Sequence, residues 1–182
     1  MSFQTTHLRT IYTLIGVCIF VVVAFIVTTK DNADHKNISY TIEGVSILLE
    51  DGTHESSTTT RYFGNELVTD LDGDGDEDIA FILTQEGSGS GTFYYAVAAL
   101  QTDSGYVGSD GYFLGDRIAP QTTEVSPNPR HKHVVVFNYA TRALHEPMTA
   151  RPSIGESVYL KIVPKTIQWA VVVPNFEGES AF

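Results

Sequence analysis

The residues whose chemistry is most evident form one run of nine, Asp70-Leu71-Asp72-Gly73-Asp74-Gly75-Asp76-Glu77-Asp78. Six of the nine side chains are carboxylates, and two glycines interrupt them. So many negative charges in so short a segment repel one another unless a cation lies among them. The run therefore predicts a metal site, and its candidate ligands are Asp70, Asp72, Asp74, Asp76 and Asp78.

The spacing within the run favours calcium, which takes six to eight oxygen ligands in flexible geometry. The pattern D-x-D-x-D-G-x-x-D is complete. In such a loop Asp70, Asp72, Asp74 and Asp78 supply carboxylates, the backbone carbonyl of Asp76 adds an oxygen, and a glycine permits the sharp turn. Magnesium suits the pattern less, because it prefers octahedral geometry with several waters. The alternative is a solvated acidic turn without a metal.

The residues after the run distinguish it from an EF-hand. An EF-hand has a bidentate Glu at its twelfth position and helices on both sides, whereas this chain has Phe81 there and a strand-like run at 79–83. The stretch DLDGDGDEDIAF resembles the strand-loop-strand calcium loops of FG-GAP (integrin-α-type) and VCBS repeats. That resemblance implies Asp70, Asp72, Asp74 and Asp78 as side-chain ligands. It covers about a dozen residues, so it implies the local loop and not the propeller that those repeats build.

The remaining sequence, including GTFYYAVAAL at 91–100, resembles bacterial membrane-anchored or secreted proteins that carry the same loop and whose activity is uncharacterised. Residues 11–28 form an uncharged apolar stretch of 18 residues, and a membrane-spanning helix needs roughly 17–25. We expect a short tail at 1–10, a transmembrane signal anchor at 11–29, a polar linker at 30–37 and a β-domain at 38–182. The alternative is a signal peptide that is cleaved.

The expected location is a single-pass membrane protein whose domain is periplasmic or extracellular. Lys and Arg counts near the apolar segment slightly favour the opposite orientation. The short N-terminal tail and the calcium loop favour an external domain, because calcium is abundant outside the cytoplasm. The membrane is thus an expected partner through the N-terminal helix, and a protein or surface polymer is a partner that the sequence leaves unspecified.

Hydrophobicity in the domain follows period two, which indicates strands. Alternation changes parity at Glu43-Gly44, where we expect a hairpin turn or bulge. Thr92–Leu100 is apolar on both faces and predicts a central strand. Further strands are expected at 134–139, 158–162 and 167–173, the last two joined by Pro164-Lys165 as a hairpin with Val171 among its inward residues. We therefore predict a mainly β fold, an antiparallel sandwich or barrel-like domain, with about eight strands.

Composition excludes several classes of function. The formal charge is −11 and no basic stripe is present, so nucleic acid is not an expected partner. The only cysteine is Cys18, in the apolar segment, which excludes disulfides and thiol chemistry in the domain.

Two weaker patterns have a functional and a simpler interpretation. His131 and His133 would be half of a metal site if both lay on a strand, but a polar turn before Val134 is the favoured interpretation. Three arginines, Arg117, Arg142 and Arg151, could bind an anion together; ion pairs or surface positions are favoured instead.

These observations predict an extracytoplasmic, membrane-anchored β-domain with one structural calcium ion, acting as a binding or structural module. The alternative is a calcium-stabilised hydrolase of the cell envelope. No residue is nominated as catalytic, so the sequence leans against an enzyme without deciding the question.

Overall fold

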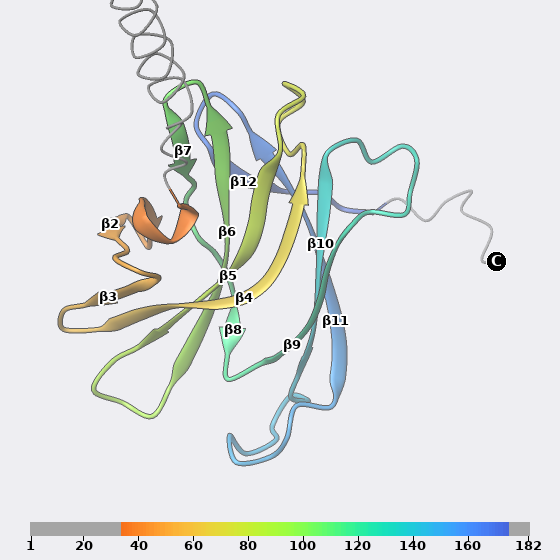
Figure 1. Cartoon of the computed structure of the whole chain (residues 1–182). Helices are drawn as coiled ribbons and strands as arrows, with labels where there is room; N and C mark the ends of the chain where they lie inside the picture. The colour runs from red at the N-terminus through yellow and green to blue at the C-terminus, as the bar shows by residue number, and fades with distance from the viewer. Residues whose placement is uncertain (1–33, 175–182) are drawn as a thin grey trace, which may run out of the picture. The chain divides into compact units, whose positions relative to one another are not determined.

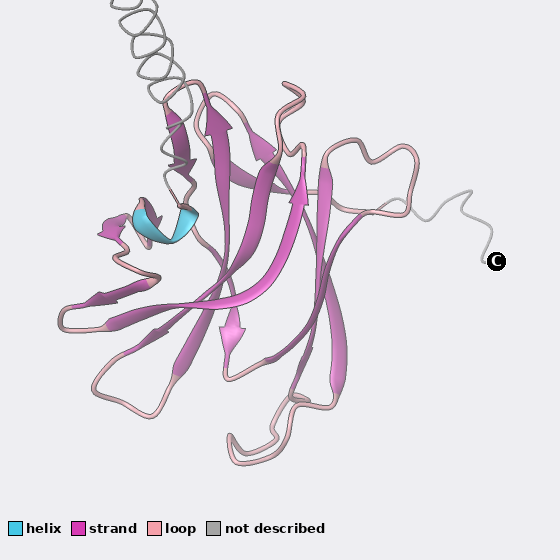
Figure 2. Cartoon of the chain, in the orientation of Figure 1, coloured by secondary structure: helices cyan, strands magenta, loops and turns pink. Residues whose placement is uncertain are grey.

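The described part of the chain is an antiparallel β structure (Figures 1 and 2). This computed structural model describes residues 34–174, which fall within the compact unit Ala33–Phe182. The described elements, in chain order, are η1 (His35–Asn37), β1 (Ser39–Ile42), β2 (Val45–Leu48), β3 (Thr53–Glu55), β4 (Thr59–Thr69), β5 (Asp78–Glu86), β6 (Thr92–Thr102), β7 (Gly105–Gly108), β8 (Tyr112–Asp116), β9 (Ala119–Val125), β10 (Val134–Thr141), β11 (Ile154–Val163) and β12 (Gln168–Val171).

The mainly β character expected from the sequence is confirmed. Between residues 34 and 174, no helix has the length and apolarity to cross a membrane. The transmembrane segment expected at 11–29 lies outside the described residues.

A six-stranded sheet lies at the centre of the domain, in the order β3-β4-β5-β6-β7, with β8 also pairing with β6. Six consecutive residues of β5 and six of β6 are buried. A strand buried on both faces has no polar side in its sequence. This explains the near-continuous apolar run at 92–100 and confirms the prediction of a central strand there.

One face of the central sheet packs on a four-stranded sheet of order β12-β11-β10-β9. Alternate residues of β5 and β6, such as Ile82 and Ala98, contact Phe137 of β10 and Leu160 of β11 in one buried cluster. The ring of Trp169 packs edge-on against that of Phe137, with 6.0 Å between the ring centroids. Each square ångström of apolar surface buried here contributes about 25 cal/mol, so this face is the main core.

The opposite face of the central sheet is covered by the β1-β2 hairpin. Tyr40 and Ile42 of β1 pack with Phe81 and Val97 in a second buried cluster. Ile42 pairs with Val45, so the turn of the hairpin is Glu43-Gly44. Both turn residues have positive φ, 51° and 81°, as a two-residue hairpin turn of this hand requires. The predicted turn is confirmed.

Other sequence-based expectations need correction. The twelve strands among residues 34–174 exceed the eight expected. The largest omission is β4, for which the sequence predicted no strand; its burial pattern is mostly intermediate or exposed, so hydrophobic alternation is weak. The β11-β12 hairpin is confirmed, but Val171 is 54% exposed. Val171 is the last residue of β12, which is an edge strand of its sheet.

The contact between the hairpin and the central sheet generates a prediction. A Cβ on Gly108 of β7 would lie 2.2 Å from the backbone oxygen of Ser39, closer than any real contact. Gly108→Ala must therefore push β1 away from β7, and we expect a loss of about 3 kcal/mol in the free energy of unfolding, measured by urea denaturation.

Gly155→Ala is the matched control, because a Cβ there would meet nothing within 4 Å. It should change the free energy of unfolding by less than about 0.5 kcal/mol. Equal stability of the two variants would contradict the close packing of β1 on β7.

Candidate metal centre

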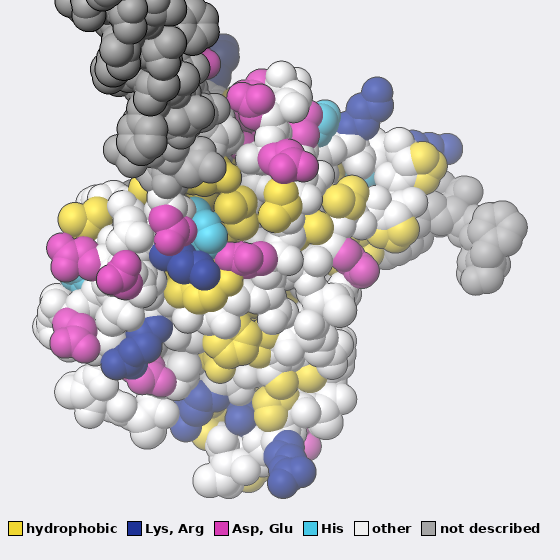
Figure 3. Space-filling model, in the orientation of Figure 1, with side chains coloured by type: hydrophobic (Ala, Val, Ile, Leu, Met, Phe, Trp, Pro, Cys, Tyr) yellow, Lys and Arg dark blue, Asp and Glu magenta, His cyan; other side chains and the backbone are white. Residues whose placement is uncertain are grey.

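The acidic run forms the connection between β4 and β5. The last pair of that ladder is Thr69 with Asp78, so the two strands close the loop at its base. Gly73 and Gly75 have φ values of 92° and 96°. Residues with a Cβ rarely adopt this region, which is why glycines stand where the loop reverses. Acidic side chains gather at this end of the molecule on the face shown in Figure 3.

Three of the predicted ligands come together. One carboxylate oxygen from each of Asp70, Asp72 and Asp78 lies within 4.8 Å of the other two. Asp74 and Asp76, the other two predicted ligands, are not in this group; both are exposed. The three grouped residues could hold a metal ion, since carboxylate oxygens are the ligands that hard divalent cations prefer.

Hydrogen bonds from the loop's own backbone orient the carboxylates. Asp70 Oδ1 accepts from the Gly73 amide at 2.6 Å, and Asp72 Oδ1 accepts from the Asp74 amide at 3.1 Å. Asp74 Oδ1 accepts from the Asp76 amide at 2.8 Å in the same way. Such side chain to backbone bonds are local turns that fix the chain. Each one uses only part of a carboxylate's capacity, which is about four lone pairs.

Asp78 differs from the others because it is wholly buried. One of its oxygens accepts from the backbone N–H of Leu71 and the other from the backbone N–H of Gln101, both at 2.8 Å. The first bond closes the loop and the second ties it to the end of β6. Charge-assisted bonds of this kind are what allow a carboxylate to be buried at all.

The pKa values of two grouped carboxylates are shifted upward. Burial raises the pKa of Asp78, two backbone hydrogen bonds oppose the change, and the charges of Asp72 and Asp74 add to it. Burial also raises the pKa of Asp72. The hydrogen bond from the Asp74 backbone amide opposes this change, whereas the charges of Asp74 and Asp70 add to it. Negative charge is therefore unfavourable here, and a bound cation would remove that cost.

His133 links the loop to the other sheet. It lies in the turn before β10, and its Nδ1 is 3.0 Å from the backbone oxygen of Asp70. Its φ of 56° is left-handed, a conformation uncommon in strands. His131 has a different partner, Ser126 Oγ at 2.9 Å. The favoured interpretation of a polar turn is confirmed, and the two histidines do not share a strand face.

The Ser126–His131 pair belongs to the turn before β10. Asn128 Nδ2 lies 3.4 Å from His131 Nε2, and the Asn128 backbone amide donates to Ser126 Oγ at 3.4 Å. Both side chains therefore hold this turn together.

An open cavity of about 310 Å³ adjoins the loop. Asp72, Asp74 and Asp76 form one wall, and Asp103, just after β6, adds another carboxylate. Pro164 and Ile167, from the β11-β12 turn, supply apolar surface. The two exposed aspartates that do not join the three-carboxylate group thus face solvent at this cavity.

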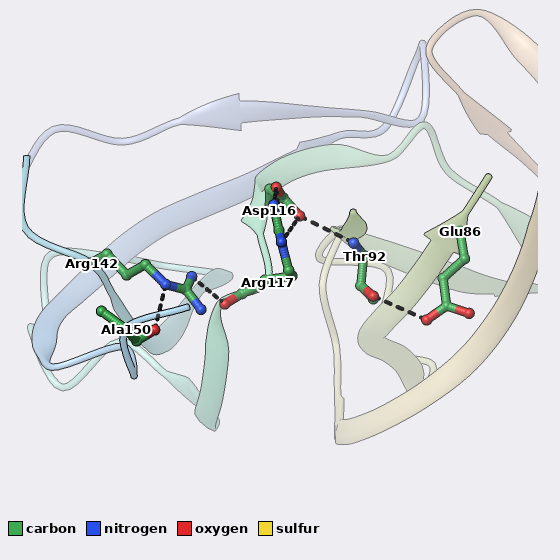
Figure 4. A network of polar contacts seen from close by, with 6 residues as sticks. All are labelled: Glu86, Thr92, Asp116, Arg117, Arg142 and Ala150. Atoms are coloured by element: carbon green, nitrogen blue, oxygen red, sulfur yellow. Dashed lines mark hydrogen bonds and ion pairs between the residues drawn. The ribbon is translucent and has the colours of Figure 1, made fainter. Parts of the chain in front are cut away.

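The arginines have structural partners (Figure 4). Arg142 donates from Nε to the Ala150 oxygen at 2.7 Å and from Nη1 to the Arg117 oxygen at 2.8 Å. Arg117 pairs with Asp116, Nη2 to Oδ2 at 2.9 Å. Arg151 is exposed. The favoured interpretation is confirmed for Arg117, which is ion-paired, and for Arg151, which lies on the surface. Arg142 fits neither description, because it is half-buried and donates to two backbone carbonyls.

Sequence reasoning missed the two groups that brace the loop from elsewhere. The Gln101 amide and the His133 ring come from positions 23 and 63 residues away from their loop partners. No local pattern marks either contact. The two-histidine motif drew attention to His133, but for a different role.

No protein-family model, no curated protein and no solved structure matches this chain.

The two hydrogen bonds that the buried Asp78 carboxylate accepts lead to a prediction for the metal-free protein. In Asp78→Asn the amide group would place a donor against one of the two backbone amides, which leaves a buried N–H unpaired. We expect a loss of about 2 kcal/mol in the free energy of unfolding, measured by urea denaturation with a chelator present.

Asp76→Asn is the control, because Asp76 is an exposed carboxylate of the same loop. It should change stability by less than about 0.5 kcal/mol. If Asp78→Asn were as stable as this control, the carboxylate would not be holding Leu71 and Gln101.

Proposed function

We propose that this chain is a membrane-anchored, extracytoplasmic β-domain whose acidic loop binds one calcium ion, and that it serves as a binding or structural module. The observation that carries the proposal is the convergence of Asp70, Asp72 and Asp78 at the base of the loop. The resemblance of the run 70–81 to FG-GAP and VCBS calcium loops supports it. A membrane anchor is supported by the uncharged stretch at 11–28.

Calcium is the favoured ion for two reasons. The donors are carboxylate oxygens on a loop with two glycines, and calcium tolerates flexible geometry better than magnesium does. One oxygen from each of three carboxylates is fewer than calcium needs, so loop carbonyls and water would complete the shell. The exposed side chains of Asp74 and Asp76 lie on the same loop.

The role proposed for the ion is structural. The loop contacts three parts of the domain: the β4-β5 ladder at its base, the end of β6 through Asp78, and the turn before β10 through His133. An ion that binds only the folded loop stabilises all three by mass action. The gain is about 2.7 kcal/mol when free calcium exceeds the dissociation constant a hundredfold.

The test is calorimetric titration of the full-length protein with calcium chloride after treatment with a chelator. We expect one site with a dissociation constant on the order of 10⁻⁴–10⁻³ M, and weaker binding of magnesium. Asp72→Asn removes one of the converging charges and should weaken calcium binding about tenfold or more, because ligand charge sets affinity in such loops.

Asp103→Asn is the matched control. Asp103 is exposed and lines the same cavity, yet it lies outside the three-carboxylate group. Its removal changes net charge equally and should alter affinity by less than about twofold. Absence of calcium binding in the wild-type protein, or an equal loss in both variants, would contradict a site at the loop.

A further inference from the structure

The sequence contains four Asp-Gly pairs, at 51–52, 72–73, 74–75 and 110–111. Such a pair can rearrange without an enzyme, because the backbone nitrogen of the glycine can attack the side-chain carboxyl carbon of the aspartate before it. Glycine favours this reaction because it has no Cβ to restrict the backbone or block the approach. The sequence alone therefore contains four equivalent sites, and the structure distinguishes them by what each glycine contacts.

In two of the four pairs the glycine amide is held by a distant part of the backbone. The Gly52 amide donates to the Lys36 carbonyl at 2.8 Å. The Gly111 amide donates to the Thr41 carbonyl at 2.7 Å, and a Cβ added to Gly111 would lie 2.5 Å from the Ile42 side chain. Neither nitrogen can reach the preceding carboxyl group unless its hydrogen bond breaks and the surrounding backbone opens.

Gly73 lies in the acidic loop and is also held in place. Its amide donates to Asp70 Oδ1 at 2.6 Å. A Cβ added to Gly73 would lie 3.4 Å from His133 Nε2, so the imidazole ring lies against this part of the loop. Asp72, the aspartate of this pair, is half-buried. Reaction at this pair would therefore also require a local opening that separates the glycine amide from its acceptor.

Gly75 differs from the other three glycines. It is exposed, its amide has no hydrogen-bond partner among residues 34–174, and a Cβ added to it would meet nothing within 4 Å. In Figure 1 the loop that carries it extends beyond the ends of β4 and β5. Asp74 is exposed as well, and its Oδ1 accepts from the Asp76 amide at 2.8 Å. That bond folds the carboxyl group of Asp74 back along the chain, over the peptide bond to Gly75.

We propose that Asp74 is a site of spontaneous isomerisation, at which the bond to Gly75 moves from the α-carbonyl carbon of Asp74 to its side chain. The Gly75 nitrogen loses its proton and bonds to Asp74 Cγ, and one carboxyl oxygen leaves as water, which closes a five-membered succinimide ring. One water then adds to the α-carbonyl carbon and breaks the original bond from that carbon to the nitrogen. The water released in the first step balances the water consumed in the second.

The product would alter the loop that carries it. Isoaspartate has the same composition and charge as aspartate, but its backbone is longer by one methylene group. The extra group falls between Asp72 and Asp78, two of the carboxylates that converge at the base of the loop. Isomerisation would therefore change the spacing within the candidate metal site without removing a charge. The inference itself does not depend on whether that site holds calcium.

The test is mass spectrometry of the full-length protein after several weeks at neutral pH and physiological temperature with a chelator present. Cleavage after glutamate places the pairs in the peptides 51–55, 67–77 and 87–124, and electron-transfer fragmentation distinguishes isoaspartate from aspartate at each position. We expect isoaspartate at Asp74 to accumulate at least about tenfold faster than at any of the other three aspartates, because each of the other glycine amides must first break a hydrogen bond.

The unfolded protein is the first control. In concentrated guanidinium chloride the four rates should agree within about threefold, because only residual local structure still distinguishes the pairs. Asp74→Glu is the second control: glutamate keeps the charge but cannot form the five-membered ring, so the signal at this position should disappear while the other three pairs are unchanged.

Three results would overturn the proposal. The first is a preference for Asp74 in the folded protein that is no larger than in the unfolded protein. The second is a faster reaction at another pair of the folded protein. The third is no isoaspartate at Asp74 in the folded protein over a period in which the unfolded protein reacts.

Discussion

The central sheet has two apolar faces, and the rest of the domain is arranged to cover them. Strands β5 and β6 present side chains such as Ile82 on one face and Phe81 on the other, and both of these are buried. Neither cover is sufficient alone: the four-stranded sheet covers one face and the β1-β2 hairpin the other. Burial of apolar area is the dominant favourable term in folding, so covering both faces of the central sheet is the main constraint on this fold.

The acidic loop is a consequence of where β5 begins. Asp78 is both the first residue of β5 and a wholly buried carboxylate. Two backbone amides compensate its charge, and they come from the loop and from β6. A carboxylate with such partners fixes the loop even without an ion. A calcium ion would relieve the remaining repulsion among Asp70, Asp72 and Asp78. The ion and the two hydrogen bonds to Asp78 would therefore stabilise the same loop.

Two histidines connect layers in opposite directions. His133 reaches the loop from the four-stranded sheet, and His35 reaches Glu66 of the central sheet from the outer layer. His133 contacts the backbone oxygen of Asp70 and lies 3.7 Å from the Asp70 carboxylate. His35 lies between the carboxylates of Glu66 and Asp34. Each histidine therefore joins an acidic segment to another part of the domain.

Local patterns in the sequence predicted a good part of this structure. The parity change at Glu43-Gly44, the apolar run at 92–100 and the hairpin at Pro164-Lys165 each depend on neighbouring residues, and each prediction is confirmed. The long strand β4 was missed because most of its side chains are half-buried or exposed, so hydrophobic alternation along it is weak. Val171 was misplaced because alternation marks a face of a strand but not whether another layer covers it.

The candidate site divides in the same way. Spacing alone determined that aspartates of the run 70–78 could surround a cation, because a short loop with glycines must bring its own side chains together. Only the tertiary structure decided that Asp70, Asp72 and Asp78 converge while Asp74 and Asp76 face solvent. It also supplied the Gln101 amide and the His133 ring, which reach the loop from distant strands. Contacts across such separations depend on how the sheets pack, and no periodicity along the chain encodes them.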